Sequence, residues 1–144
     1  MANKDLDRKR AEFAYSCVKK FVDNNDEEKN KKYRGYIRNT PTMILNHGLG
    51  ATFAFMFSKR LKKDGEVYNA IAENIYDWII KDENKYLLKL DSKKNAQDKL
   101  EELMNQVIEL PSSEYRMVSN EILSLLAWMK RFVEGLVEGE DNGE

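Results

Sequence analysis

The chain has 144 residues, of which 42% are hydrophobic and 34% are charged, a balance typical of one folded domain rather than of a disordered chain. A single cysteine excludes an internal disulfide bond, and a single histidine excludes a histidine-rich metal site. The chain opens on charged residues and has no apolar stretch long enough to cross a bilayer, so we expect a soluble, cytoplasmic protein.

Charge is distributed unevenly along the chain, although the net charge is only -1. Residues 1–65 contain 15 Lys and Arg against 8 Asp and Glu, a net charge of +7, whereas residues 66–144 contain 9 against 17, a net charge of -8. Such an asymmetry indicates a charged partner on one side of the molecule, or electrostatic stacking of copies. Two solvated faces of different composition explain it equally well.

The first half of the chain predicts three helices. Apolar residues recur at helical spacing over 4–23, and the Asp and Asn residues that follow end this helix. The second helix covers about 28–46, and Pro41 predicts a break or kink near residues 39–40 because proline lacks an amide donor. Gly48 is expected to end it with a positive φ. A short apolar helix over 49–62 follows, with Leu61 on its inner side.

The second half predicts three more helices, over 66–81, 95–109 and 113–137, and the last of them is expected to be the central one. Ser112 or Ser113 is a candidate cap for the last helix. Residues 82–94 predict a loop with one helical turn. The expected fold is therefore all-α, a compact bundle of about six helices in a single domain over 1–137, with a disordered acidic tail over 138–144.

The sequence offers little catalytic chemistry. It has no glycine-rich phosphate loop and no cysteine or histidine spacing that would bind a metal, so we expect no catalytic residues, no metal and no cofactor. Cys17 and His47 are the only candidates for a nucleophile–base pair, and a packed cysteine and a helix-ending histidine are the simpler interpretation. Most aromatic residues lie at core spacing, whereas Tyr15, Phe55 and Trp128 lie just off it and are candidates for a subunit interface.

Basic residues are the more informative group. Arg34 and Arg38 are spaced i, i+4 and share one helix face, and other basic residues cluster near helix ends. If these residues converge in space, they form a positive surface for a phosphate backbone, which they would contact without reading sequence. The alternative is ordinary solvated charge. The candidate RNA-binding residues are Arg8, Arg10, Arg34, Arg38, Lys59, Arg60, Lys63, Lys130 and Arg131.

Three stretches in chain order resemble a known family. Residues 6–14 (LDRKRAEFA) resemble its N-terminal signature, a Leu-Asp pair followed by a basic run and an aromatic residue. Tyr33-Arg34, followed by Pro41 and by residues 46–55 (NHGLGATFAF), resembles its second signature, here with His47 inserted between Asn and Gly. Tyr115-Arg116 and residues 121–132 (EILSLLAWMKRF) resemble its closing helix. The family is the small helical subunit of the Cmr (type III-B) CRISPR RNA-targeting complex.

This resemblance implies an all-α, non-catalytic protein in antiviral defence, several copies of which stack along a helical ribonucleoprotein. Its implied partners are the backbone subunit, the large subunit, further copies of itself, and the guide RNA and target RNA; no membrane is involved. Target cleavage would belong to the backbone subunit. The resemblance therefore predicts that the basic residues stabilise the guide–target duplex. A helical adaptor that binds only protein is the alternative, and an enzyme that uses Cys17 or His47 is a distant third.

Overall fold

The computed structural model describes residues 2–90 and 96–139, and this part of the chain contains six α-helices and no strand, which confirms the predicted all-α class. Residues 1, 91–95 and 140–144 lie outside the described residues, and with them most of the predicted acidic tail. The helices are α1 (Ala2–Asn24), α2 (Glu27–His47), α3 (Leu49–Lys59), α4 (Gly65–Ile79), α5 (Ala96–Ile108) and α6 (Ser112–Leu136).

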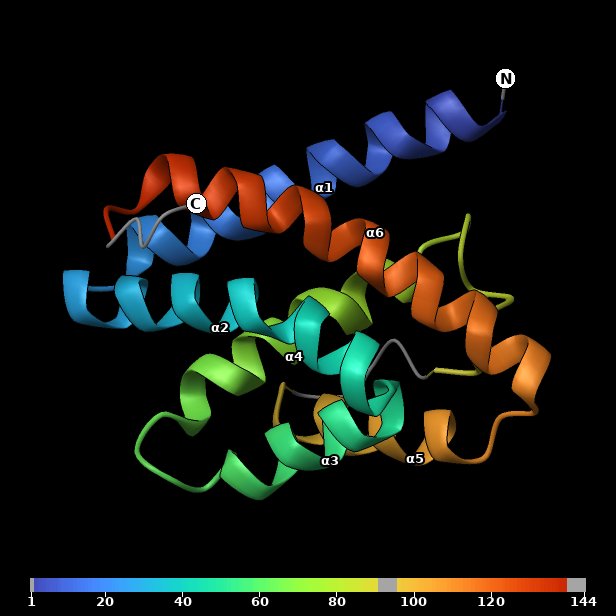
Figure 1. The fold of residues 1–144 in the computed structure, drawn as a ribbon. Coiled ribbons are helices and arrows are strands. Elements are labelled where there is room, and N and C mark those ends of the chain that lie inside the picture. The colour runs from blue at the N-terminus through green and yellow to red at the C-terminus, as the bar shows by residue number, and fades with distance from the viewer. Residues whose placement is uncertain (1, 91–95, 140–144) are drawn as a thin grey trace.

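The helices surround one cluster of buried hydrophobic residues, to which all six contribute. Figure 1 shows α1 and α6 together on one side, α3 and α5 on the opposite side, and α2 and α4 between them. The prediction of α6 as the central helix is wrong: α6 packs mainly against α1 and α2, whereas α4 packs against α1, α2, α3 and α5. None of the described helices is long and apolar enough to cross a membrane.

Of the break or kink predicted near residues 39–40, the structure shows a kink rather than a break. α2 continues as one helix to His47, and its ribbon changes direction in its second half (Figure 1). Ile37 and Ile44, on either side of the proline, are both buried, so packing holds the two halves in one helix despite the missing amide. Thr40 Oγ1 also donates a hydrogen bond of 2.6 Å to the carbonyl oxygen of Tyr36.

Gly48 separates α2 from α3 and has the predicted positive φ, 91°. Its amide donates to the carbonyl oxygen of Ile44 at 2.8 Å, which closes α2. A Cβ on this residue would lie 2.8 Å from the hydroxyl of Tyr115, which accepts a hydrogen bond from the amide of Gly50 at 2.9 Å. Glycine is therefore required here both by the backbone conformation and by the approach of α6.

Two predictions at helix ends are wrong. α3 ends at Lys59, and Leu61 lies in the following turn with 83% of its surface exposed rather than on an inner helix face. The N-cap of α6 is Pro111, and neither Ser112 nor Ser113 makes the predicted capping bond. The serines fall inside the first helical turn because the extended Pro111 (φ -61°, ψ 156°) already directs its carbonyl oxygen to the amide of Tyr115, at 2.9 Å.

Candidate nucleic-acid interface

The nine predicted RNA-binding residues do not converge on one surface. Arg8 and Arg10 lie on α1, where Arg8 is exposed and Arg10 reaches Glu121 of α6. Arg34 and Arg38 lie on α2 beside the C-terminal half of α6, which carries Lys130 and Arg131. The remaining three, Lys59, Arg60 and Lys63, lie together where α3 turns into α4.

Arg10 belongs to a buried polar network rather than to a surface. Only 8% of its area is exposed, and its Nε and Nη2 donate to the two carboxylate oxygens of Glu121 at 2.7 and 2.9 Å. Its Nη1 donates to Asp7 at 2.7 Å, while Trp78 Nε1 donates to Glu121 at 2.8 Å and Trp128 Nε1 to Asp7 at 3.0 Å. The hydrogen bond to Glu121 raises the pKa of Arg10, so the guanidinium stays charged despite burial. Arg10 thus joins α1 to α6, and its charge is paired inside the molecule rather than presented at the surface.

Three further predicted residues have contacts within the chain. Arg8 is exposed and pairs with Asp5 at 3.2 Å, and Arg38 Nε lies 2.9 Å from Glu134. The guanidinium of Arg34 lies where a Cβ on Gly139 would stand, so it packs against the backbone that follows α6. Lys130 and Arg131 have no carboxylate partner among residues 2–90 and 96–139.

The turn between α3 and α4 carries the densest positive charge. Lys59, Arg60, Lys62 and Lys63 occupy four of five consecutive positions. None of these four cations forms an ion pair with a carboxylate in the described part of the chain. Cations at the C-terminal end of α3 also suit the helix dipole, which contributes about 0.3–1 kcal/mol each in its last turn. The unpaired charge remains available to an external anion.

Backbone hydrogen bonds hold this turn in a compact form. The amide of Lys62 donates to the carbonyl oxygen of Lys59 at 2.9 Å, and the amide of Gly65 donates to that of Lys62 at 3.0 Å. A Cβ on Gly65 would overlap the carbonyl oxygen of Arg60 and lie 2.7 Å from that of Lys59, so the turn closes only around a glycine.

Asp64, within the turn, fastens it to α2. Lys32 Nζ donates to Asp64 Oδ1 at 2.7 Å and the Tyr36 hydroxyl donates to Oδ2 at 2.9 Å. The hydrogen bond from Lys32, and then that from Tyr36, hold the pKa of Asp64 below its ordinary value. The carboxylate of Asp64 is therefore hydrogen-bonded to α2, and its adjacent Lys63 also lowers its pKa through charge.

Two of the turn cations lie over aromatic rings, and one of them, Arg60, also borders a groove. Lys59 Nζ lies 5.5 Å from the ring centre of Phe55, and the Arg60 guanidinium lies 4.2 Å from that of Phe57. A groove of about 620 Å³ runs from Arg60, Lys62 and Lys63 to the end of α1 and to α4. Arg60, Lys62 and Lys63 thus lie on a concave edge of the molecule, which Glu66 and Glu73 of α4 also line.

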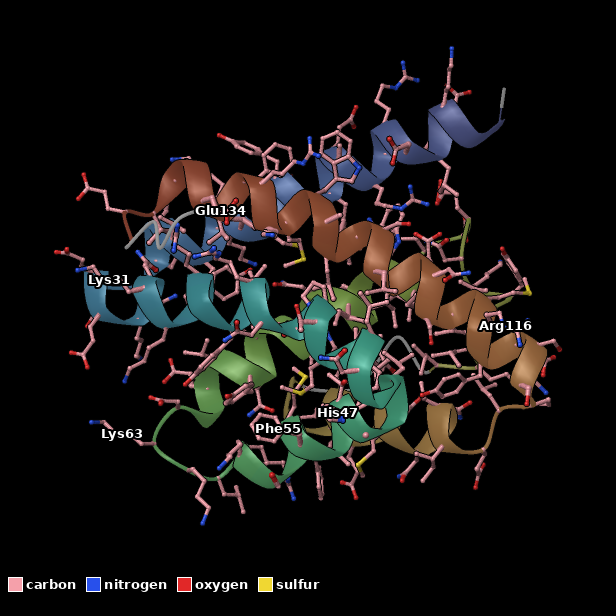
Figure 2. All side chains as sticks on the ribbon, viewed as in Figure 1. Lys31, His47, Phe55, Lys63, Arg116 and Glu134 are labelled. Atoms are coloured by element: carbon pink, nitrogen blue, oxygen red, sulfur yellow. The ribbon has the colours of Figure 1, made fainter. Side chains whose placement is uncertain are left out.

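Further basic residues lie at the same end of the molecule and were missed as site candidates. Lys29 Nζ donates to Glu66 at 2.9 Å, and Figure 2 labels both Lys31 and Lys63 on the left side of the molecule. This basic end could have been predicted from the sequence, because residues 29–63 contain nine Lys and Arg and no Asp or Glu.

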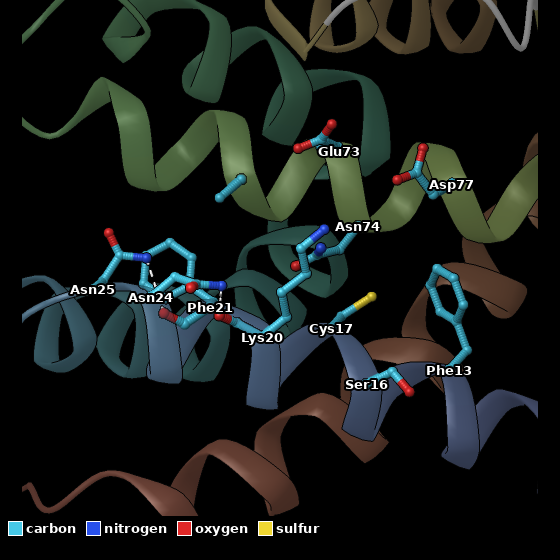
Figure 3. A pocket seen from close by; sticks show the side chains of 11 residues that line it. Phe13, Ser16, Cys17, Lys20, Phe21, Asn24, Asn25, Glu73, Asn74 and Asp77 are labelled. Carbon is cyan, nitrogen blue, oxygen red and sulfur yellow. Dashed lines mark hydrogen bonds between the residues drawn. The ribbon is translucent and has the colours of Figure 1, made fainter.

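The structure does not place Cys17 and His47 in one pocket, so it gives the catalytic alternative no support. Cys17 lines a pocket of about 410 Å³ between α1 and α4, and Figure 3 shows it facing Glu73, Asn74 and Asp77 of α4. His47 is exposed at the end of α2 and does not line this pocket. Burial raises the pKa of Cys17 to about 12, so the reactive thiolate is scarce at neutral pH.

We expect iodoacetamide to modify Cys17 in the folded chain at pH 8 about a thousandfold more slowly than in urea, because the pKa rises from 9.0 to about 12. Mass spectrometry of timed, quenched samples would measure both rates. A faster rate in the folded chain than in urea would show that the thiol is activated and would revive the catalytic alternative.

The features so far define a small all-α protein with a basic edge and without a converging set of reactive groups among its described residues. Residues 6–136 match the family model of the CRISPR-associated protein Cas_Cmr5. The crystal structure of a CRISPR-associated Cmr5 family protein from Thermus thermophilus matches the fold with a TM-score of 0.66. The two chains are 20% identical, and the match covers 92% of this chain and 97% of the other.

Because the family match spans nearly the whole chain, the protein belongs to the Cmr5 family, as the three sequence signatures predicted. It is a small subunit of the type III-B CRISPR complex, and its partners include other subunits of that complex.

Proposed function

We propose that this subunit is non-catalytic and stabilises the guide RNA–target RNA duplex through sequence-independent contacts from the turn between α3 and α4. The observation that carries the proposal is the group of four cations within five positions, none of which forms an ion pair among the described residues. RNA phosphates would supply the missing negative charge. The subunit would do so in the cytoplasm, beside the backbone subunit and further copies of itself.

The chemistry of the turn suits a subunit that must accept any guide sequence. Lysine and arginine contacts to phosphates fix position without reading bases, and their strength depends on salt. A few such contacts give the isolated subunit modest affinity, and several copies along one RNA raise the total affinity through a high effective concentration. Lys130 and Arg131 support a second, weaker contact because their charges are also unpaired within the described residues.

The proposal is tested by reversing charge in the turn. In the reconstituted complex, Lys62→Glu with Lys63→Glu is expected to weaken binding of target RNA about tenfold at physiological salt. It should also reduce the slope of log K against log salt concentration by about one to two, because two phosphate contacts are lost. Filter binding or fluorescence anisotropy over a salt series measures both quantities.

Lys85→Glu with Lys89→Glu is the matched control, since it makes the same change of net charge at two exposed positions outside the basic end. An unchanged salt slope in the turn variant would contradict the RNA contact. If both variants assembled and bound RNA normally, the alternative of an adaptor that touches only protein would stand instead.

A further inference from the structure

Asn30, near the start of α2, has a buried amide oxygen without a partner. The residue is 8% exposed, and its Nδ2 donates to the carbonyl oxygens of Val22 at 3.0 Å and of Asn25 at 3.3 Å. These two bonds fix which end of the amide is the nitrogen, and the oxygen at the other end accepts no hydrogen bond within residues 2–90 and 96–139. A buried acceptor without a donor is costly, so such an atom ordinarily meets a water or an ion.

A hollow of about 310 Å³ adjoins this side chain where the end of α6 lies beside the start of α2 (Figure 1). The residues that line it are Glu27, Asn30, Leu136, Val137 and Glu138. Neither Val22 nor Asn25, which hold the amide nitrogen, is among them, so the oxygen is the polar atom that Asn30 has left for the hollow. The hollow has room for several waters, each of which takes roughly 30 Å³ in the liquid.

Among the described residues, the charged side chains that line the hollow are carboxylates. Glu27 and Glu138 are both exposed, so their carboxylates are free to turn inward. Two cations lie just outside. Lys31 Nζ lies 3.3 Å from Glu27 in an exposed pair, which is weak and easily exchanged, and Arg34 packs against Gly139.

The helix ends also favour positive charge in this place. The last carbonyl groups of α6, where Leu136 and Val137 line the hollow, have no helical amide to accept from and form the negative end of the helix dipole. The start of α2 is the positive end of another dipole, which Asp26, Glu27 and Glu28 offset. Carboxylate, amide and carbonyl oxygens are the hard donors that Mg²⁺ and Ca²⁺ prefer.

We propose that this hollow binds a divalent cation, held by Asn30 Oδ1 and by the carboxylates of Glu27 and Glu138. Mg²⁺ suits this donor set, because it is commonly bound through one or two carboxylates and keeps several waters, for which the hollow has room. No group of three Asp, Glu, His or Cys side chains suited to a metal occurs among the described residues, so two carboxylates and an amide predict weak binding, with a Kd of about 1 mM. The ion would fasten the end of α6 to the start of α2, independently of the RNA contact.

Thermal unfolding of the full chain, followed by circular dichroism, tests the proposal in about 10 mM MgCl₂ and in NaCl of the same ionic strength. We expect Mg²⁺ to raise the melting temperature by about 4 °C relative to NaCl, because an ion that binds only the folded chain stabilises it at ten times its Kd. Mn²⁺, used as a paramagnetic probe in place of Mg²⁺, should broaden amide NMR signals only around Asn30 and Val137.

Glu27→Gln with Glu138→Gln should abolish both the Mg²⁺ shift and the local broadening, and it should leave the fold intact because both positions are exposed. Glu101→Gln with Glu109→Gln is the matched control, since it removes the same charge at two exposed positions in and just after α5, and it should keep both effects. Equal melting temperatures of the wild type in MgCl₂ and NaCl would overturn the proposal and leave the Asn30 oxygen to water alone. So would an undiminished Mg²⁺ shift in the Glu27 and Glu138 variant, or broadening centred elsewhere.

Discussion

Replacing Glu121 by glutamine is expected to lower the free energy of unfolding by about 3 kcal/mol, because it leaves the Arg10 charge buried without its main counter-charge. Arg10 is held by both carboxylate oxygens of Glu121, and Trp78 donates to one of the same oxygens. An amide can accept at only one atom and would direct its own donors at the guanidinium. The melting temperature, followed by circular dichroism, should fall by roughly 10 °C.

Glu12→Gln on the exposed side of α1 is the control for loss of one carboxylate, and it should change the unfolding free energy by less than about 0.5 kcal/mol. Urea unfolding of both variants gives the two free energies. A loss of less than about 1 kcal/mol for Glu121→Gln would mean that Asp7 alone can satisfy Arg10, and that the network is not the main link between α1 and α6.

The number and order of the helices could be predicted from the sequence because each helix buries a stripe of apolar residues. The stripes of α4 and α6, for example from Val67 to Ile79 and from Val118 to Val133, are visible as helical spacing and are buried in the fold. Such a stripe depends only on neighbours along the chain, so it needs no knowledge of the partner helix.

The spacing of apolar residues fails to predict where helices end. At Pro41 the sequence left a break or a kink open, and buried residues on both sides of the proline keep α2 continuous. Leu61 continues the apolar spacing of α3, yet the backbone bonds of the turn around Gly65 end the helix two residues earlier. Apolar spacing does not register the backbone hydrogen bonds of a turn, so it extends the helix too far.

The candidate site was predicted in part. Lys59, Arg60 and Lys63 are adjacent in the sequence, so their shared surface could be foreseen. The pairing of Arg10 within the fold could not be foreseen, because its partner Glu121 is 111 positions away. In the sequence, Arg10 is indistinguishable from the other basic residues of the N-terminal run. Pairing by carboxylates decides which cations are free, and that pairing is a property of the fold.

Gly65→Ala is expected to destabilise the chain by about 2–4 kcal/mol, since the new Cβ would overlap the carbonyl oxygen of Arg60. The obstructing atoms belong to the backbone and cannot rotate away, so the turn must open and its hydrogen bond from Gly65 to Lys62 must be lost. Because the same turn arranges the four cations, RNA binding by the assembled complex should weaken even at temperatures where the variant remains folded. Thermal unfolding and RNA binding at about 10 °C separate the two effects.

Gly135→Ala is the informative comparison, because the same substitution at that position of α6 meets no atom within 4 Å. Alanine restricts the unfolded chain and favours the helix, so this variant should gain about 0.5–1 kcal/mol. The two substitutions add the same methyl group, and only the space around it differs. Equal effects of the two substitutions on stability would show that the turn can relax without cost. A turn that relaxes so easily would be too flexible to hold its four cations in one arrangement against a phosphate backbone.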